Sequence, residues 1–220
     1  MDKIKQAIAY MQENKIEEAA ALFTEVIEEN PEDPVGYINF GNLLFHMNDF
    51  TRAQRFYERA MELDKHAATA YYGLGNLYYE QSLYPKALEN FQKAIELGLE
   101  EPDVYFLLGM TFQHQEQYKL SLPYLLRATE LDPDNQDSLF QYGLALAQSD
   151  HLKDAEKIFH KVLSLETNHS DANYNLGVVA LFEDRLEQAL TYFNEALRIQ
   201  PEHILAANGK EKTEALLNES

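Results

Sequence analysis

Apolar residues recur at three- and four-residue steps along most of the chain, in blocks that come in pairs. This is the spacing that places side chains on one face of an α-helix. Turn-forming residues separate the blocks, as at Asn48-Asp49, Asp132-Pro133-Asp134-Asn135 and Gln200-Pro201-Glu202. No segment has the pattern of a strand. The pattern therefore predicts an all-α chain built from helical hairpins.

One arrangement of small and large residues returns every 34 residues. In each repeat, a glycine follows a bulky apolar residue. Alanine or another small residue stands 12 positions after the glycine and again 19 positions after it, and a large apolar residue lies between these two. The glycines are Gly41, Gly75, Gly109, Gly143 and Gly177, and the large residues are Tyr57, Phe91, Leu125, Phe159 and Phe193. Small residues let two helices approach closely where they cross, and large ones fill the space between them.

This pattern resembles the tetratricopeptide repeat (TPR) family. The family's opening aromatic residue is present as Tyr37, Tyr71 and Tyr105 and replaced at Leu139 and Asn173, and its closing proline is present as Pro31, Pro133 and Pro201. The resemblance implies an all-α, right-handed superhelical solenoid that forms a single array over residues 1–220. Its repeats would be 1–33, 34–67, 68–101, 102–135, 136–169 and 170–203, with 204–220 as a C-terminal capping helix.

The two ends and one proline depart from the repeat. The first repeat keeps Ala19, Phe23 and Val26 for the inner contact. The final helix would pack through its large apolar residues, Ile204, Leu205, Leu216 and Leu217. Pro123 favours either a late start of its helix or a local bend that changes the pitch of the array.

In the TPR family, the first helices of the repeats line a concave groove. The residues opposite the packing face of these helices follow from a rotation of about 100° per residue. The candidate peptide-binding residues are Asn39, Asn42, Tyr72, Asn76, Tyr79, Phe106, Met110, Phe140, Gln141, Tyr174 and Asn175.

Three patterns stand out among these positions. The amides can pair with an extended peptide backbone, as in asparagine ladders of some TPR proteins, or can simply be solvated. The aromatic column Tyr72, Phe106, Phe140 and Tyr174 can contact a ligand or pack between neighbouring first helices. The carboxylates Asp103, Asp137 and Asp171 form an acidic rim that would attract a basic peptide, or favour helix N-termini by charge and capping.

The sequence has 37 acidic and 18 basic residues, a formal charge of −19. This balance argues against binding to nucleic acid or to an anionic membrane, and it favours a basic protein partner or solubility. Only Lys5 is basic among the central groove positions, so we do not expect the carboxylate clamp of chaperone-binding TPR proteins. The lack of a signal peptide or spanning segment favours a cytoplasmic location.

No catalytic or metal-binding pattern is present. The seven histidines form no His-x-x-x-His pair, cysteine is absent, and no phosphate-binding or nucleophile motif occurs. We therefore expect no enzyme activity, no metal and no cofactor. The favoured hypothesis is an interaction scaffold that binds extended neutral or basic segments of partner proteins in its groove. The alternatives are a self-assembling structural protein, which leaves homo-oligomerisation possible, and an acidic surface that docks a basic protein.

Overall fold

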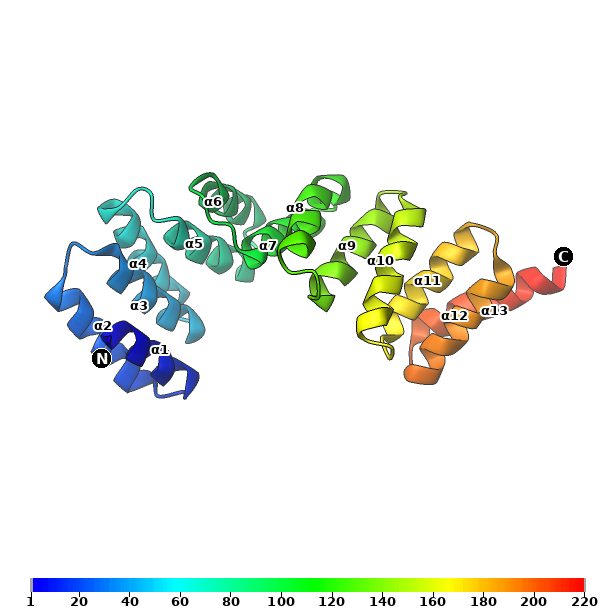
Figure 1. The fold of residues 1–220 in the computed structure, drawn as a ribbon, viewed down its shortest axis with the longest axis horizontal. Helices are drawn as coiled ribbons and strands as arrows, with labels where there is room; N and C mark the ends of the chain where they lie inside the picture. The colour runs from blue at the N-terminus through cyan, green and yellow to red at the C-terminus, as the bar shows by residue number, and fades with distance from the viewer. Residues whose placement is uncertain (1, 220) are drawn as a thin grey trace. The chain divides into compact units, whose positions relative to one another are not determined.

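The computed structural model describes residues 2–219, and the regular elements in that range are thirteen α-helices (Figure 1). The first helices of the repeats are α1 (Lys3–Gln12), α3 (Pro34–His46), α5 (Ala68–Glu80), α7 (Pro102–Gln113), α9 (Gln136–Gln148) and α11 (Ser170–Phe182). The second helices are α2 (Ile16–Glu29), α4 (Phe50–Leu63), α6 (Tyr84–Glu96), α8 (Tyr118–Leu131), α10 (Leu152–Leu165) and α12 (Leu186–Ile199), and α13 (Ile204–Glu219) follows them. The all-α repeat solenoid is confirmed.

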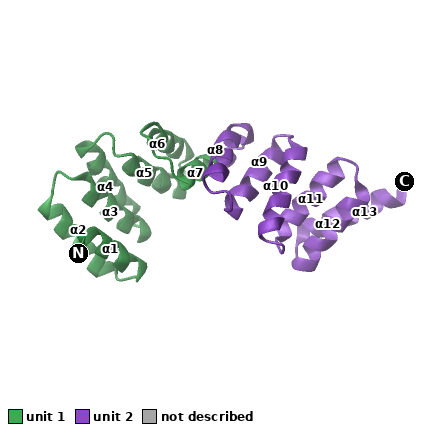
Figure 2. Cartoon of the chain, viewed as in Figure 1, with its two compact units in different colours: residues 1–111 green, residues 112–220 purple. Residues whose placement is uncertain are grey.

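The protein divides into two compact units, unit 1 at residues 1–111 and unit 2 at residues 112–220 (Figure 2). The division falls inside α7. Within each unit, first helices pack against their own second helices, and the next hairpin lies beside them. A single array over residues 1–220 and its right-handed superhelix stay predictions.

Small and large residues form the core as their spacing predicts. Ala53, Ala87 and Phe91 are fully buried, and Tyr57 is 1% exposed. A β-carbon added to Gly75 would lie 2.5 Å from the Phe91 ring, a distance that real structures do not tolerate. Glycine at the crossing is therefore what allows the ring of the second helix to rest on the backbone of the first.

Each hairpin turns through one residue in the left-handed region of φ. These residues are 34 positions apart: Asn14, Asn48, Ser82, Glu116, Asp150 and Asp184. At Asn48, two backbone hydrogen bonds close the turn. The Asn48 amide donates to the Phe45 carbonyl at 2.9 Å, and the Asp49 amide donates to the Leu44 carbonyl at 2.9 Å. This pairing satisfies carbonyls that the helix end leaves without partners, so the turn ends one helix and orients the next.

Pro123 lies inside α8, five residues after the helix begins at Tyr118. The expectation of a late helix start is therefore wrong. The proline leaves one helical hydrogen bond unmade in the second turn of α8, and the local bend expected as the alternative stays a prediction.

The expected packing of α13 through four large apolar residues is wrong for Ile204, Leu205 and Leu216, the last of which is 37% exposed, whereas Leu217 is partly buried. Ile204 and Leu205 are 73% and 57% exposed, whereas Ala206 and Thr213 are fully buried. A β-carbon on Gly209 would lie 2.7 Å from the Phe193 ring, so the last helix rests on α12 through its small residues. In the first repeat, Ala19 and Phe23 make the predicted inner contact and are fully buried.

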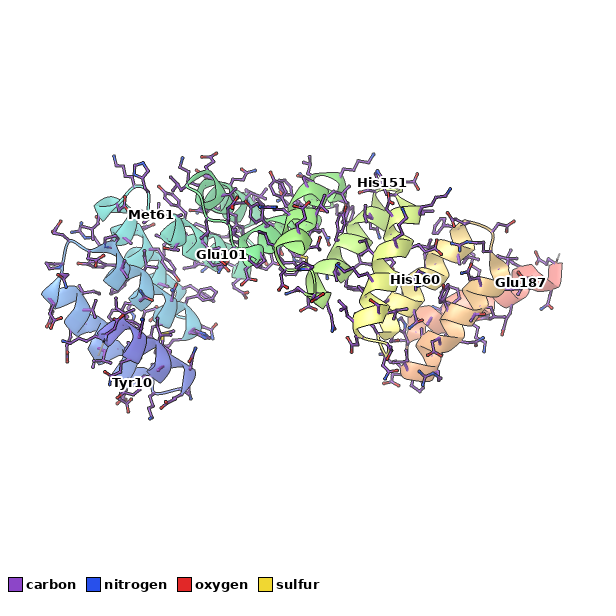
Figure 3. All side chains as sticks on the ribbon, in the orientation of Figure 1. Tyr10, Met61, Glu101, His151, His160 and Glu187 are labelled. Carbon is purple, nitrogen blue, oxygen red and sulfur yellow. The ribbon has the colours of Figure 1, made fainter. Side chains whose placement is uncertain are left out.

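The second helices of neighbouring repeats are also joined by polar contacts. His160, labelled in Figure 3, extends from α10, and its Nε2 atom lies 3.3 Å from the Tyr192 hydroxyl of α12. Gln188 donates to the same hydroxyl at 3.3 Å. The contact of His160 with Tyr192 joins α10 to α12, which are the second helices of neighbouring repeats in unit 2.

Candidate functional site

The candidate residues lie on the first helices and are divided between the two compact units. The first-helix surface of unit 1 comprises Asn39, Asn42, Tyr72, Asn76, Tyr79, Asp103, Phe106 and Met110. The first-helix surface of unit 2 comprises Asp137, Phe140, Gln141, Asp171, Tyr174 and Asn175. All of these side chains are exposed or partly exposed, so each unit has its own candidate surface.

Asn39 and Asn175 use their amides in the same way. Nδ2 of Asn39 donates to the Val35 carbonyl at 2.8 Å, and Nδ2 of Asn175 donates to the Asp171 carbonyl at 2.8 Å. Each bond joins residues four apart on one helix and occupies the amide nitrogen. The Oδ1 atom is therefore the end of each amide that remains available to accept a hydrogen bond.

Asn42 is held in the opposite way. Its Oδ1 atom accepts a 2.8 Å hydrogen bond from the Tyr57 hydroxyl, which belongs to the second helix α4. The side chain of Asn42 is otherwise exposed, so its Nδ2 atom is the end that remains available, as a donor.

Asn76 is partly buried, and its amide is bonded to a neighbouring tyrosine. It forms a hydrogen bond with the Tyr72 hydroxyl. Burial raises the pKa of Tyr72, and the hydrogen bond with Asn76 lowers that pKa by a smaller amount. Within residues 2–219, the Oδ1 atom of Asn76 is buried without a hydrogen-bond partner. In unit 2, the backbone carbonyl of Gln141 accepts from Nε2 of Gln113 at 3.0 Å, which joins α9 to the end of α7.

The aromatic column packs mainly against rings outside the first helices. Ring centroids lie 6.1 Å apart for Tyr72 and Phe91, 5.9 Å for Phe140 and Phe159, and 6.0 Å for Tyr174 and Phe193. These partners belong to the second helix of the same hairpin. Tyr72, Phe140 and Tyr174 are only partly buried, so these three rings pack against the second helices and still have exposed area on the surface.

Tyr79, Phe106 and Met110 add further apolar area that is partly exposed. The Tyr79 ring meets Tyr84 edge-on at 6.0 Å, and burial raises the pKa of its hydroxyl. Phe106 and Met110 are also partly buried on α7. These side chains give the first-helix surface of unit 1 partly exposed apolar area in addition to its amides.

The rim carboxylates Asp103, Asp137 and Asp171 are exposed and lie in the first turns of their helices. Asp137 and Asp171 do not cap these helices, because the caps are the side chains of Asn135 and His169. Their charge is still favourable at a helix N-terminus. Asp171 has an additional partner, since its Oδ1 atom lies 3.1 Å from Nε2 of His203.

Tyr57 and His203 were not among the site residues expected from the sequence. Tyr57 is the single tyrosine at a repeat position where the other repeats have phenylalanine or leucine, which is a signal that the sequence does contain. His203 is 7% exposed, and its ring lies 5.1 Å from that of Tyr174. No signal in the sequence indicated that this histidine would meet a rim carboxylate.

Metal-binding clusters and membrane-spanning helices are both absent from the part of the chain that the structure describes. Among residues 2–219, no group of three or more His, Cys, Asp or Glu side chains could hold a metal ion. In the same range, no helix combines the length and the apolar character needed to cross a membrane.

Comparison with known proteins gives the family. Tetratricopeptide repeat models match residues 4–33, 32–100, 66–134, 106–163 and 146–212. The crystal structure of YrrB, described as a TPR protein with an unusual peptide-binding site, is 44% identical. The match spans 86% of this chain and 97% of YrrB, with a TM-score of 0.83.

Two further matches are more limited. The curated TPR repeat-containing protein YrrB of Bacillus subtilis (strain 168) is 56% identical over 39 residues, which spans 18% of this chain and only 19% of that relative. The structure of pilF from Pseudomonas aeruginosa is 17% identical over 96% of both proteins, with a TM-score of 0.78, and so shares the fold.

These matches agree with the repeat and the helical hairpins described above. The tetratricopeptide repeat mediates protein–protein interaction, its members bind other proteins or peptides, and the family is generally non-enzymatic. By its repeats and by the 44% identity to YrrB over 86% of its length, this chain belongs to the tetratricopeptide repeat family.

Proposed function

We propose that the protein is a non-enzymatic scaffold that binds extended segments of partner proteins on its first-helix surfaces and so helps multiprotein complexes to assemble. The segments it binds are neutral or basic, because the net charge is −19 and acidic side chains lie along the rim. The amides bind the backbone of the segment, and the partly exposed rings contact its apolar side chains.

The direction of the amides is the observation on which this proposal rests. Asn39, Asn42 and Asn175 each have one end of the amide bonded within the protein and the other end available on the surface. An amide held in this way is ready to bind without first losing rotational freedom. An extended peptide offers backbone N–H and C=O groups to such a surface whatever its sequence. The description of YrrB as having a peptide-binding site supports the same use of this protein.

The test is the affinity of the full-length protein for a fluorescent peptide of alternating serine and lysine residues, measured by fluorescence anisotropy. Changing Asn39, Asn42 and Asn76 together to Ala removes the candidate amides from the first helices of unit 1. We expect the affinity to fall about ten-fold because more than one hydrogen bond is lost. Asn90→Ala is the matched control, because Asn90 makes the same bond to a carbonyl four residues earlier, at 2.8 Å, but on the second helix α6.

Unchanged affinity in the triple variant, with the helical content retained, would contradict binding by the amides. The charge of −19 supports a second candidate, in which a basic protein docks on the acidic surface without pairing through its backbone. That candidate predicts that affinity falls steeply with salt and is the same in the triple variant as in the original protein.

A further inference from the structure

Tyr57 occupies a position that needs no hydroxyl group for packing. The equivalent residues Phe23, Phe91, Phe159 and Phe193 are each 0% exposed without one, and Tyr57 is 1% exposed. Its ring passes between α3 and α5 where both helices have glycine. A β-carbon on Gly41 or Gly73 would lie 2.7 Å or 2.5 Å from the Cε1 atom of Tyr57.

The Tyr57 hydroxyl reaches the first-helix surface through this gap. It donates to Oδ1 of Asn42 at 2.8 Å, and no other hydrogen-bond partner for it occurs within residues 2–219. The opposite orientation of the Asn42 amide would leave the proton of a buried hydroxyl without an acceptor, which is costly. Burial also raises the pKa of Tyr57, so the hydroxyl keeps its proton and remains a donor.

Asn39 lies one turn before Asn42 on α3 and presents the opposite polarity. Its Nδ2 atom is bonded to the Val35 carbonyl, so Oδ1 is left to accept. The helix therefore offers an acceptor at Asn39 and a donor at Asn42. Residues three apart on a helix are neighbours on its surface. The edge of an extended peptide presents N–H and C=O groups at short intervals, which matches such a pair.

We propose that Tyr57 is a positioning residue that fixes the outward direction of the Asn42 amide, so that Asn39 and Asn42 together take one backbone N–H and one backbone carbonyl group of an extended peptide. This inference rests on the proposed function and adds to it the residue that sets the hydrogen-bond polarity of the α3 surface. A hydroxyl on the second helix thereby acts on the first-helix surface through Asn42.

Tyr57→Phe tests the proposal, because phenylalanine at the equivalent positions shows that the ring alone fills the space. Without the hydroxyl, the Asn42 amide can rotate, and we expect the serine–lysine peptide to bind about five-fold more weakly, as for the loss of one hydrogen bond. Tyr78→Phe is the matched control, since Tyr78 is a 9% exposed tyrosine of the same unit. We expect its affinity to equal that of the original protein.

A double-mutant cycle with Asn42→Ala separates positioning from packing. If Tyr57 acts through Asn42, then Tyr57→Phe changes the affinity in the original protein and changes nothing further in the Asn42→Ala background. An equal loss in both backgrounds, or original affinity in Tyr57→Phe alone, overturns the proposal. Failure of the proposed function is a different result, in which the triple amide variant itself binds as tightly as the original protein.

Discussion

At the scale of single residues, Gly73 sets the distance between two repeats. The Tyr57 ring from one hairpin rests directly on its backbone in the next, and a β-carbon there would lie 2.6 Å from the Cζ atom of that ring. Gly36 on α3 is also buried, but the nearest atom to its β-carbon would be Cγ1 of Ile27 at 3.0 Å, which belongs to a side chain that can move.

We therefore expect a change from glycine to alanine to have different effects on stability at these two positions. Gly73→Ala forces the Tyr57 ring out of its place, and we expect a loss of about 1–3 kcal/mol in the free energy of unfolding. Gly36→Ala has a smaller conflict, which the higher helix propensity of alanine offsets, by about 0.8–1 kcal/mol. Urea unfolding followed by circular dichroism measures both variants. A Gly73→Ala protein as stable as the Gly36→Ala protein would show that the close approach is not needed.

At the scale of helices, His203 joins the last repeat to α13. Its Nδ1 atom accepts from the Ala206 amide at 3.2 Å, so in the neutral ring the proton lies on Nε2 and is donated to Asp171. Asn135 stands two repeats earlier at the equivalent position and caps α9 by accepting from the Ser138 amide at 2.9 Å. The protein thus uses both residue types for the same cap.

This equivalence gives a prediction for the C-terminal helix. His203→Asn keeps an oxygen that can cap α13, whereas His203→Ala keeps none, so we expect the alanine variant to be less stable by about 1 kcal/mol. Hydrogen exchange of the amides at the start of α13 measures the effect locally. Equal exchange in the two variants would mean that the cap does not hold the start of the helix.

At the scale of the whole molecule, the hairpins could be predicted from the sequence because their packing depends on residue size. The period of 34 residues places Gly75 opposite Phe91, and local spacing suffices to recognise that pair. Packing of α13 could not be predicted in this way, because its contact uses small residues while Ile204 and Leu205 stay exposed. Hydrophobicity alone does not show which face of a last helix has a neighbour.

The candidate surface was predicted as a set of positions, but the state of each side chain was not. Asn39 and Asn42 look equivalent in sequence, yet one leaves an acceptor and the other a donor available. That difference arises from the path of the Tyr57 ring between two glycines, which brings its hydroxyl to Asn42, 15 residues earlier in the sequence. Hydrogen-bond direction is a property of the packed structure rather than of the repeat pattern.

The central claim is that this protein binds the backbone of an extended peptide, and one comparison tests it most directly. The affinity of the original protein is measured for the serine–lysine peptide and for the same peptide with N-methyl groups on its backbone nitrogens, which keeps the charge and removes the N–H donors. We predict that the N-methylated peptide binds at least about five-fold more weakly at the same salt concentration. Equal affinity for the two peptides would contradict backbone binding and leave attraction to the acidic surface as the source of the interaction.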